Sequence, residues 1–319
     1  MSLIEDSLSR YRPLVGDWQH LIEACQRPLP PVVWANPVRL EQRRRLATAL
    51  GYDQEAGIAD LLGARGYQTT PLGWIADAWR VEGLERPGYT LENQLGLIHV
   101  QEEISLAPPV VLGARPDERV LDMCAAPGGK TARIAVSMDN RGTLIANDVR
   151  AHRLRALRSN CERLGVTNVV VTPIDGTRFP LDAGPFDRIL LDVPCSCEGN
   201  LRDTPKAAGT GSDGSIKGRS GLQATLLGRA WKLLRHGGIL VYSTCTFAPE
   251  ENELVLDYTL GDDATIEPFT IPGLVGDPGV VEWAGRGLRE DCRNLVRYWP
   301  HLNDTGGFTI ARVRKQPVC

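Results

Sequence analysis

From about residue 100 onward the chain repeats one rhythm: a short apolar, β-rich run, then a polar loop, then a helical stretch. Alternation of this kind predicts a parallel sheet covered by helices on both faces. We therefore expect an α/β fold with a Rossmann-like, doubly wound sheet. The apolar runs are RVLDMC, GTLIAND, VVVTPID, RILLDVP and GILVYSTC, and the last is preceded by the helical stretch LQATLLGRAWKLLRHGG.

The first hundred residues lack this rhythm and predict two smaller parts. Residues 1–30 place apolar side chains at helical spacing before a run of prolines, which indicates a helical extension and a linker. Residues 31–100 alternate short strand-like and helix-like runs, so we expect a small α+β domain ahead of the main domain at 101–319. The expected strands are Val32 to Ala35 and Trp79 to Glu82, and the expected helices are Leu40 to Leu50 and Ala56 to Arg65.

Acids and thiols collect where the strands of the main domain end. In open α/β sheets ligands bind beyond the carboxyl ends of the strands, so this edge is the expected site. The stretch between Asp203 and Gly221 is poor in apolar residues, and we expect a mobile loop at the same edge. The strand-ending groups are Asp122 to Cys124, Asp148, Asp175, Asp192 to Cys195, and Ser243 to Cys245.

Composition sets limits on the class of protein. A net charge of -3 gives no overall basic excess, so any surface that binds nucleic acid must be local. We find no apolar run of membrane-spanning length and no export leader, and we expect a cytoplasmic protein without a membrane partner. The eight cysteines are then expected as free thiols. Cys195 and Cys197 lack a second close Cys or His pair, which argues against zinc, so we expect no metal.

The segment VLDMCAAPGGKT begins as a strand and ends as the start of a helix. A triphosphate-binding loop needs glycine where Cys124 stands, and the spaced glycines of a dinucleotide loop are absent. A loop for S-adenosylmethionine remains, with Asp148 holding the ribose hydroxyls and Asp175 accepting from the adenine amino group. The alternative for both acids is that they only cap the helices that follow.

Cys195 and Cys245 each follow an apolar strand, and the predicted sheet brings these two strand ends together. Most buried cysteines are inert packing residues, but these two lie at the ligand edge beside polar groups. A thiolate that adds to carbon 6 of a pyrimidine makes carbon 5 nucleophilic toward a sulfonium methyl group. Asp192 is placed to neutralise charge at ring nitrogen 3, and the second thiol can assist removal of the carbon 5 hydrogen.

Four motifs, VLDMCAAPGGKT, NDVRAHRLRALRSNCERLG, FDRILLDVPCSCEGN and ILVYSTCTFAPEENELV, in this order and spacing, resemble the Nop/Sun family of RNA cytosine-5 methyltransferases. GLIHVQEEIS and RYWPHLNDTGGFTIARV add to the likeness, which covers residues 95 to 315. The resemblance implies that Cys245 attacks carbon 6 and that Cys195 assists release. It also implies that Asp192 contacts the cytosine and that Lys130 supports the site.

The same resemblance implies a methyltransferase sheet, S-adenosyl-L-methionine as cofactor, and ribosomal or transfer RNA as partner, for a chain that we expect to be monomeric. Where the family usually has Pro-Cys-Ser-Gly this chain has Cys197, which places a third thiol nearby. The expected cofactor-binding residues are Cys124, Ala125, Ala126, Pro127, Gly128, Gly129, Lys130, Asp148, Arg153, Asp175, Gly176 and Asp192.

Two arginine clusters are candidates for RNA phosphates, although a solvated helix face is the ordinary explanation of either. No further RNA-binding module is expected after the core, so target choice falls to the amino-terminal unit and the core surface. Alternatives for function are a methyltransferase for DNA cytosine or protein side chains, and a binding or ribosome assembly factor that has kept the fold without turnover. The clusters are Arg39, Arg43, Arg44 and Arg45, and Arg150, Arg153, Arg155 and Arg158.

Overall fold

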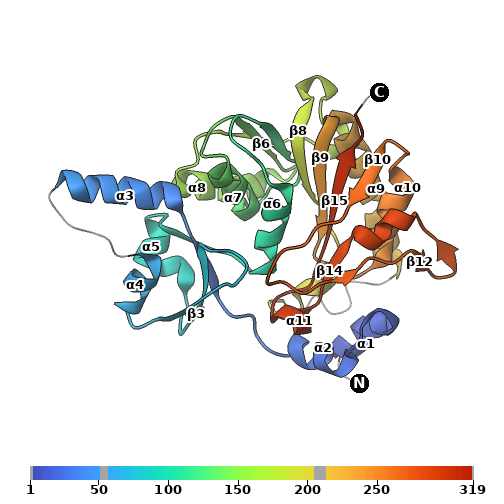
Figure 1. Cartoon of the computed structure of the whole chain (residues 1–319), viewed down its shortest axis with the longest axis horizontal. Helices are drawn as coiled ribbons and strands as arrows, with labels where there is room; N and C mark the ends of the chain where they lie inside the picture. The colour runs from blue at the N-terminus through green and yellow to red at the C-terminus, as the bar shows by residue number, and fades with distance from the viewer. Residues whose placement is uncertain (1–2, 51–56, 205–212, 318–319) are drawn as a thin grey trace.

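The sheet predicted by the strand and helix rhythm forms the centre of the molecule (Figure 1). In the computed structural model, which describes residues 3–50, 57–204 and 213–317, its strands run in the order β11-β14-β15-β9-β8-β5-β6-β7, with β10 beside β15. The central strands are parallel: β5 (Arg119–Asp122), β6 (Thr143–Asn147), β7 (Val169–Thr172), β8 (Phe186–Asp192) and β9 (Leu234–Thr244).

One edge of the sheet is antiparallel, which the sequence did not predict. Strand β15 (Phe308–Lys315) runs antiparallel to β9 and is flanked by β10 (Ala264–Glu267) and β14 (Val296–Tyr298), with β11 (Asp277–Pro278) at the edge. Antiparallel strands need no crossover helix between them, so the alternation of strands and helices in the sequence did not predict this edge of the sheet. A separate ribbon joins β12 (Glu282–Trp283) to β13 (Arg286–Gly287).

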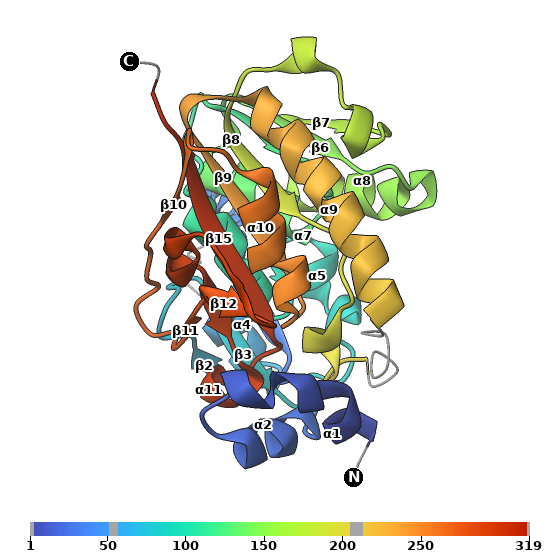
Figure 2. The ribbon, with the colours of Figure 1, turned by 90° about the vertical axis from the view of Figure 1, so that its right-hand side faces the viewer.

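Helices cover both faces of the sheet because successive strand residues point to opposite sides. Val120 packs with α6 (Ala107–Leu112) and α7 (Gly129–Ser137), whereas Leu121 packs with α9 (Asp213–Leu233) and α10 (Glu253–Thr259) on the other face (Figure 2). Helix α8 (Ala151–Leu164) lies beside α7. The expected doubly wound fold is therefore confirmed.

Helix α9 begins earlier than the sequence indicated. We expected a loop from Asp203 to Gly221, but residues 213–221 form the first turns of this helix, and 205–212 lie outside the described residues. Ile216 is buried among the amino-terminal helices, so tertiary packing outweighs the low helix propensity of the glycines and serines there. The expected loop is thus wrong for its second half.

The amino-terminal extension is three short elements rather than one helix. They are α1 (Leu3–Leu8), the 3-10 helix η1 (Ser9–Leu14) and α2 (Trp18–Cys25). Pro13 lies inside η1, and Asp17 starts α2 by accepting a hydrogen bond from the backbone N–H of His20 at 3.0 Å. These elements pack on the main domain through a buried cluster that includes Leu201, Phe247 and Trp299.

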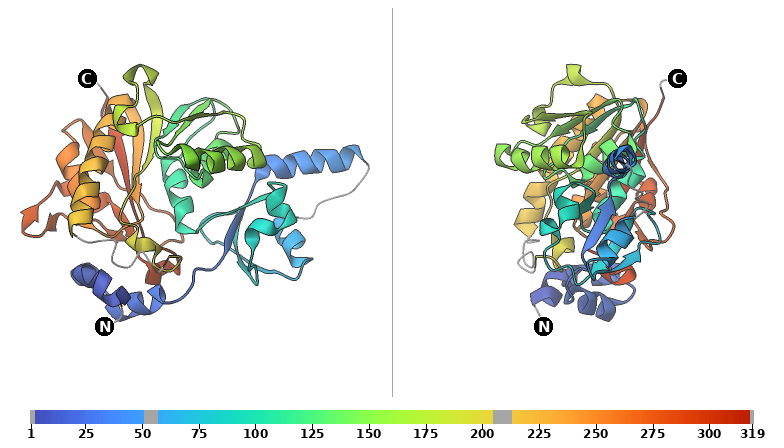
Figure 3. Two further views of the ribbon diagram at one scale, coloured as in Figure 1. Left: turned by 180° about the vertical axis from the view of Figure 1, so that it is seen from behind. Right: turned by 90° about the vertical axis from the view of Figure 1, so that its left-hand side faces the viewer.

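The small domain is an antiparallel sheet with strand order β2-β3-β1-β4. The expected strands and helices are present, with altered bounds, and α3 projects away from the body of the molecule (Figures 1 and 3). No residue of α3 is buried. The elements are β1 (Val32–Ala35), β2 (Gln68–Pro71), β3 (Ala78–Glu82), β4 (Ile98–Val100), α3 (Pro37–Ala49), α4 (Ile58–Gly63) and α5 (Leu91–Gln94).

The short elements complete the chain. Among the residues described, no helix has the length and apolar character needed to cross a bilayer. The remaining helical elements are η2 (Pro87–Tyr89), η3 (Ile104–Leu106), η4 (Gly176–Arg178), η5 (Leu181–Ala183), η6 (Glu198–Asn200), η8 (Pro249–Glu251), η9 (Glu290–Asn294) and α11 (Pro300–Asn303).

Candidate active site

The strand ends of the main domain surround a cleft of about 770 Å³. An adjoining cavity of about 370 Å³ lies beneath the loop between β5 and α7. Every residue that the sequence predicted for catalysis or cofactor binding lines one of the two spaces. The larger cleft is lined by Cys124, Ala126, Pro127, Lys130, Asp148, Arg153, Asp175, Gly176, Asp192, Cys195 and Cys245, and the smaller adds Ala125, Gly128 and Gly129.

The glycines of the first loop serve packing as well as access. Gly128 has φ +104°, and a Cβ there would lie 2.6 Å from Leu157 Cδ1, so this glycine allows α8 to approach the loop. A Cβ on Gly129 would lie 3.0 Å from Gln101 Oε1. Arg153, on α8, donates hydrogen bonds to the carbonyl of Ala126 and to Asp148, which ties the loop to the end of β6.

Asp148 and Asp175 both lie in the cleft and both also fix local backbone. Asp148 accepts from the Arg150 N–H at 2.8 Å and from Arg153 at 3.1 Å. Asp175 caps η4, since its carboxylate accepts from the Thr177 N–H at 2.9 Å. The capping role that the sequence left open therefore holds for Asp175, whereas Asp148 fixes the turn before α8 without capping that helix, whose N-cap is Arg150.

Asn147 was missed by the sequence reasoning, although it directly precedes Asp148. Its buried side-chain amide donates to the carbonyls of Met123 and Ile174, and its oxygen accepts from the Ile174 N–H and from Thr172. This one amide holds the chain beyond β5, β6 and β7 together. A lone asparagine at a strand end carries no distinctive signal in a single sequence.

Lys130 and Asp192 form an ion pair at the floor of the cleft. Lys130 Nζ lies 2.8 Å from Asp192 Oδ2, and Ser243 Oγ donates to Asp192 Oδ1 at 2.8 Å. Burial works to lower the pKa of Lys130, but the neighbouring Asp192 carboxylate outweighs it and raises that pKa above its ordinary value. The ammonium also lies 5.3 Å from the ring centre of Phe308, which lines the cleft.

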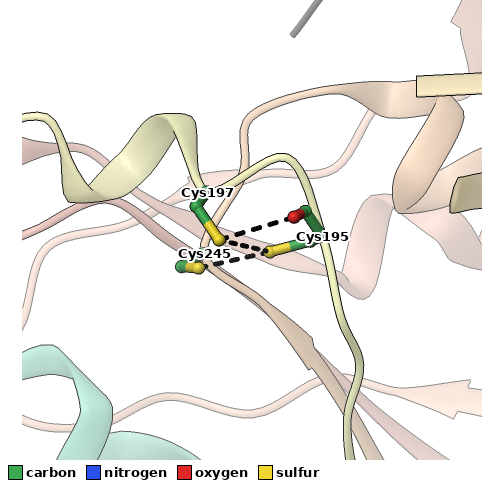
Figure 4. Close-up of side chains that lie close together, drawn as sticks. All are labelled: Cys195, Cys197 and Cys245. Carbon is green, nitrogen blue, oxygen red and sulfur yellow. Dashed lines mark hydrogen bonds between the residues drawn. The ribbon is translucent and has the colours of Figure 1, made fainter. Parts of the chain in front are cut away.

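The two predicted thiols, those of Cys195 and Cys245, lie close together in the cleft. Cys195 Sγ and Cys245 Sγ are 3.2 Å apart, and Cys197 Sγ lies 4.0 Å from Cys195 Sγ (Figure 4). Asn200 Nδ2 donates to Cys245 Sγ at 3.5 Å. All three sulfur-bearing residues line the cleft. The sequence therefore placed Cys195 and Cys245 correctly at one edge of the sheet.

The thiols differ in acidity because they share hydrogen bonds. Donation toward Cys197 and Cys245, together with burial, raises the pKa of Cys195 well above its ordinary value. For Cys245 the hydrogen bond from Cys195 acts to lower the pKa, but the contact with Cys197 and burial outweigh it, so the pKa is raised. The hydrogen bonds that Cys197 accepts lower its pKa.

Two buried acids hold the cysteine loops, and the sequence reasoning assigned them no role. Glu251 accepts from the Ser196 N–H at 3.1 Å and from Gln223 at 2.7 Å. Glu198 accepts from Tyr11 Oη at 2.6 Å and from Thr246 Oγ1 at 2.8 Å. Both residues lie inside the quoted motifs, but their hydrogen-bond partners come close only in the folded chain.

The arginines of the two predicted clusters make different contacts. Arg39 donates to the carbonyls of Glu162 and Arg163 at the end of α8, so it joins the two domains. Arg44 and Arg45 are exposed and pair with Glu41. In the second cluster, Arg153 belongs to the cleft.

A doubly wound sheet whose strand ends gather acids and a glycine turn is typical of a Rossmann-like fold, and the solved structure that this chain resembles at 33% identity is that of a methyltransferase homolog. The chain belongs to the 16S rRNA methyltransferase RsmB/F family, which it matches over residues 109–314. It is 45% identical over 229 residues, or 72% of its length, to the tRNA (cytosine(49)-C(5))-methyltransferase of Pyrococcus abyssi, and covers 73% of that protein.

Other relatives agree with this assignment. The ribosomal RNA small subunit methyltransferase F of Serratia proteamaculans is 36% identical over 92% of this chain, which spans 59% of that protein's length. A crystal structure of a methyltransferase homolog protein from Pyrococcus horikoshii superposes with a TM-score of 0.80 at 33% identity, covering 99% of each chain. The expected family is therefore confirmed.

Proposed function

We propose that this protein is an RNA (cytosine-5)-methyltransferase that uses S-adenosylmethionine and a transient bond between Cys245 and carbon 6 of the base. The observation that carries the proposal is the 3.2 Å separation of the Cys195 and Cys245 sulfurs, in the same cleft as the Lys130–Asp192 pair. Two thiols beside a carboxylate and an ammonium supply a nucleophile, a second sulfur to assist proton removal, and stabilisation of ring charge.

The cleft residues fit the proposed cofactor. A volume of about 770 Å³ lies in the range of small-molecule sites, and its lining combines the carboxylates of Asp148 and Asp175 with apolar side chains such as Met123 and Leu226. When bound, S-adenosylmethionine would supply an electrophilic methyl group. Residues 124–130 would hold it, together with Asp148, Arg153, Asp175 and Gly176.

The protein's own groups then have separate tasks. Cys245 adds to carbon 6, and Asn200, which donates to its sulfur, stabilises the thiolate. Asp192, held by Lys130 and Ser243, faces the ring nitrogen where charge develops. Cys195 assists removal of the carbon 5 proton, after which the Cys245–carbon bond breaks and the product leaves.

Trapping of the covalent intermediate distinguishes the roles of the two thiols. Cys195→Ala should accumulate an RNA–protein adduct that survives a denaturing gel, because addition by Cys245 proceeds while elimination stalls. Cys245→Ala and the double variant should give no adduct, and turnover of labelled methyl groups should be lost in all three. An adduct in Cys245→Ala alone would reverse the assigned roles, and full turnover in either single variant would contradict the mechanism.

We propose RNA as the class of substrate, either transfer RNA or ribosomal RNA. Relatives named for transfer RNA and for ribosomal RNA both support an RNA substrate, and bisulfite sequencing of total RNA from a deletion strain would identify the cytosine. The monomeric state and the cytoplasmic location stay predictions. The free thiols of the seven described cysteines are consistent with a reducing compartment.

A further inference from the structure

Three thiols converge at one point of the cleft, although the sequence showed only two of them close together. The sulfurs of Cys195, Cys197 and Cys245 all lie within 4.8 Å of one another (Figure 4). Cys195 and Cys197 come from the loop after β8, and Cys245 directly follows β9. Zinc seemed excluded from the sequence because no second Cys or His pair follows Cys197, but the fold supplies Cys245 as the third thiol.

The spacing suits a thiophilic ion. Zinc binds sulfur at roughly 2.3 Å in tetrahedral geometry, which separates neighbouring sulfurs by roughly 3.8 Å. The separations of 3.2 and 4.0 Å lie on either side of that value and the third lies within 4.8 Å, so side-chain rotations that move the sulfurs by roughly 1 Å or less suffice. Because all three residues line an open cleft, a fourth position facing solvent is available to a water molecule.

Cys197 occupies a backbone conformation that its side chain does not favour. Its φ is +62° and its ψ is +23°, in the left-handed region, which residues with a Cβ rarely adopt. Glycine adopts this conformation readily because it has no Cβ. In this chain the strained position instead carries a thiol whose sulfur lies beside the other two, and strain kept at a site is a reason to look for a role.

We propose that Cys195, Cys197 and Cys245 form a binding site for Zn²⁺ or an ion of the same thiophilic class. On binding, three S–H bonds lose their protons to solvent and three sulfur–metal bonds form, which leaves a net charge of -1 on the site. Affinity therefore rises with pH. Under the proposed function, an occupied site blocks methyl transfer, because both reacting sulfurs are held by the metal.

The test measures the metal before the activity. The full-length chain, stripped with a chelator and kept reduced without oxygen, is titrated with Zn²⁺ against a chromogenic competitor and with Co²⁺ for thiolate-to-metal charge-transfer absorption. The wild type should bind one ion. Cys197→Gly should bind at least roughly tenfold more weakly and show a weaker charge-transfer band at saturation, since it removes one of three sulfur ligands.

Matched variants keep the outcome interpretable. Cys25→Ala removes a buried thiol on α2, outside the cleft, and should bind like the wild type. Cys197→Ser keeps the size of the side chain and should be as weak as Cys197→Gly. Equal affinity in the wild type and Cys197→Gly, or no binding by the wild type at micromolar zinc, overturns the site.

Activity then tests the consequence separately. Stoichiometric zinc should stop methyl transfer by the wild type and a chelator should restore it, whereas Cys197→Gly should stay active at the same zinc concentration. Zinc that binds without slowing transfer overturns the inhibitory role. Because the binding readout needs no substrate, failure of the proposed RNA activity is distinguishable from failure of the metal site.

Discussion

At the scale of single residues, the fold controls the charge of Asp122. Its side chain is completely buried, Oδ2 accepts a hydrogen bond from Thr131 at 2.7 Å, and Oδ1 has no partner in the part of the chain that the structure describes. Burial raises the pKa of Asp122 to about 7, from an ordinary value of 3.8. The folded protein therefore keeps a proton that the unfolded chain releases, and this contribution to stability is lost as pH rises from about 4 to about 7.

We expect Asp122→Asn to remove this pH dependence, because its amide oxygen can still accept from Thr131. The melting temperature of the variant, relative to that of the wild type, should increase as pH rises from 5 to roughly 7. The difference should become constant above the pKa of Asp122 in the folded protein. Calorimetry at four pH values checks this. Asp117→Asn, at an exposed carboxylate paired with Arg141, is the control, and a pH-independent difference for Asp122→Asn would contradict the argument.

The site residues that the sequence predicted share a property that single-sequence reasoning can use. Cys195, Cys245 and Asp192 follow apolar strands, and parallel strand ends meet at one edge by geometry alone. Glu198 and Glu251 were missed because their partners, Tyr11 and Gln223, are distant in sequence and only packing brings them near. The placement of residues at strand ends is thus predictable, but the hydrogen bonds that hold the loops are not.

At the scale of elements, α3 is the part most exposed to a partner. It carries no buried residue and projects from the small domain (Figure 3). The side chains of Arg44 and Arg45 on this helix are exposed. Both pair with Glu41, and exposed ion pairs of this kind contribute little to stability. The helix is therefore free to exchange these pairs for phosphates at small energetic cost.

We expect Arg44→Ala with Arg45→Ala to weaken RNA binding without lowering thermal stability. Each lost phosphate contact should reduce the slope of log K against log salt concentration by roughly 0.7 for single-stranded RNA. Filter binding at several salt concentrations measures the slope. The control is Arg141→Ala with Arg235→Ala, two exposed, paired arginines at the amino edge of the sheet, and an equal slope change in both double variants would exclude α3 as the contact.

The limits of element prediction are visible in α9 and β15. The stretch from Asp213 to Gly221 has the composition of a loop, yet Ile216 is buried beside the amino-terminal helices and the segment is helical. Strand β15 pairs antiparallel with β9 across more than sixty residues of intervening chain. Local periodicity predicted the parallel strands, whereas these two features depend on contacts that no local pattern records.

At the scale of the whole molecule, an ion pair between Arg133 and Asp77 adds to the hydrogen bonds of Arg39 in joining the small domain to the methyltransferase domain. Arg133, on α7, donates to both carboxylate oxygens of Asp77 at 2.6 and 2.8 Å, and its guanidinium lies 5.2 Å from the ring centre of the buried Trp34. The side chain of Arg133 is 14% exposed and that of Asp77 is 34% exposed, so the pair is partly shielded from water. Removing one partner of such a pair is costly, because the other charge stays behind.

Arg133→Met should therefore affect RNA and cofactor differently. RNA that contacts both domains must order them on binding, so its dissociation constant should rise roughly fivefold or more for each 1 kcal/mol of lost anchoring. The cofactor should bind unchanged, because its expected ligands, residues 124–130 with Asp148 and Asp175, all belong to the methyltransferase domain. Calorimetric titration with S-adenosylmethionine and filter binding with RNA measure the two constants.

Two further variants separate anchoring from general damage. Asp77→Asn should reproduce the RNA defect, and combining it with Arg133→Met should add little, since the two residues act as one unit. Arg119→Met removes an exposed arginine at the start of β5, which likewise lies near an aromatic ring, 5.5 Å from the ring centre of Phe186, and should leave RNA affinity unchanged. If Arg133→Met weakened cofactor and RNA equally, the pair would support the cleft itself, and the small domain would not depend on it for its orientation.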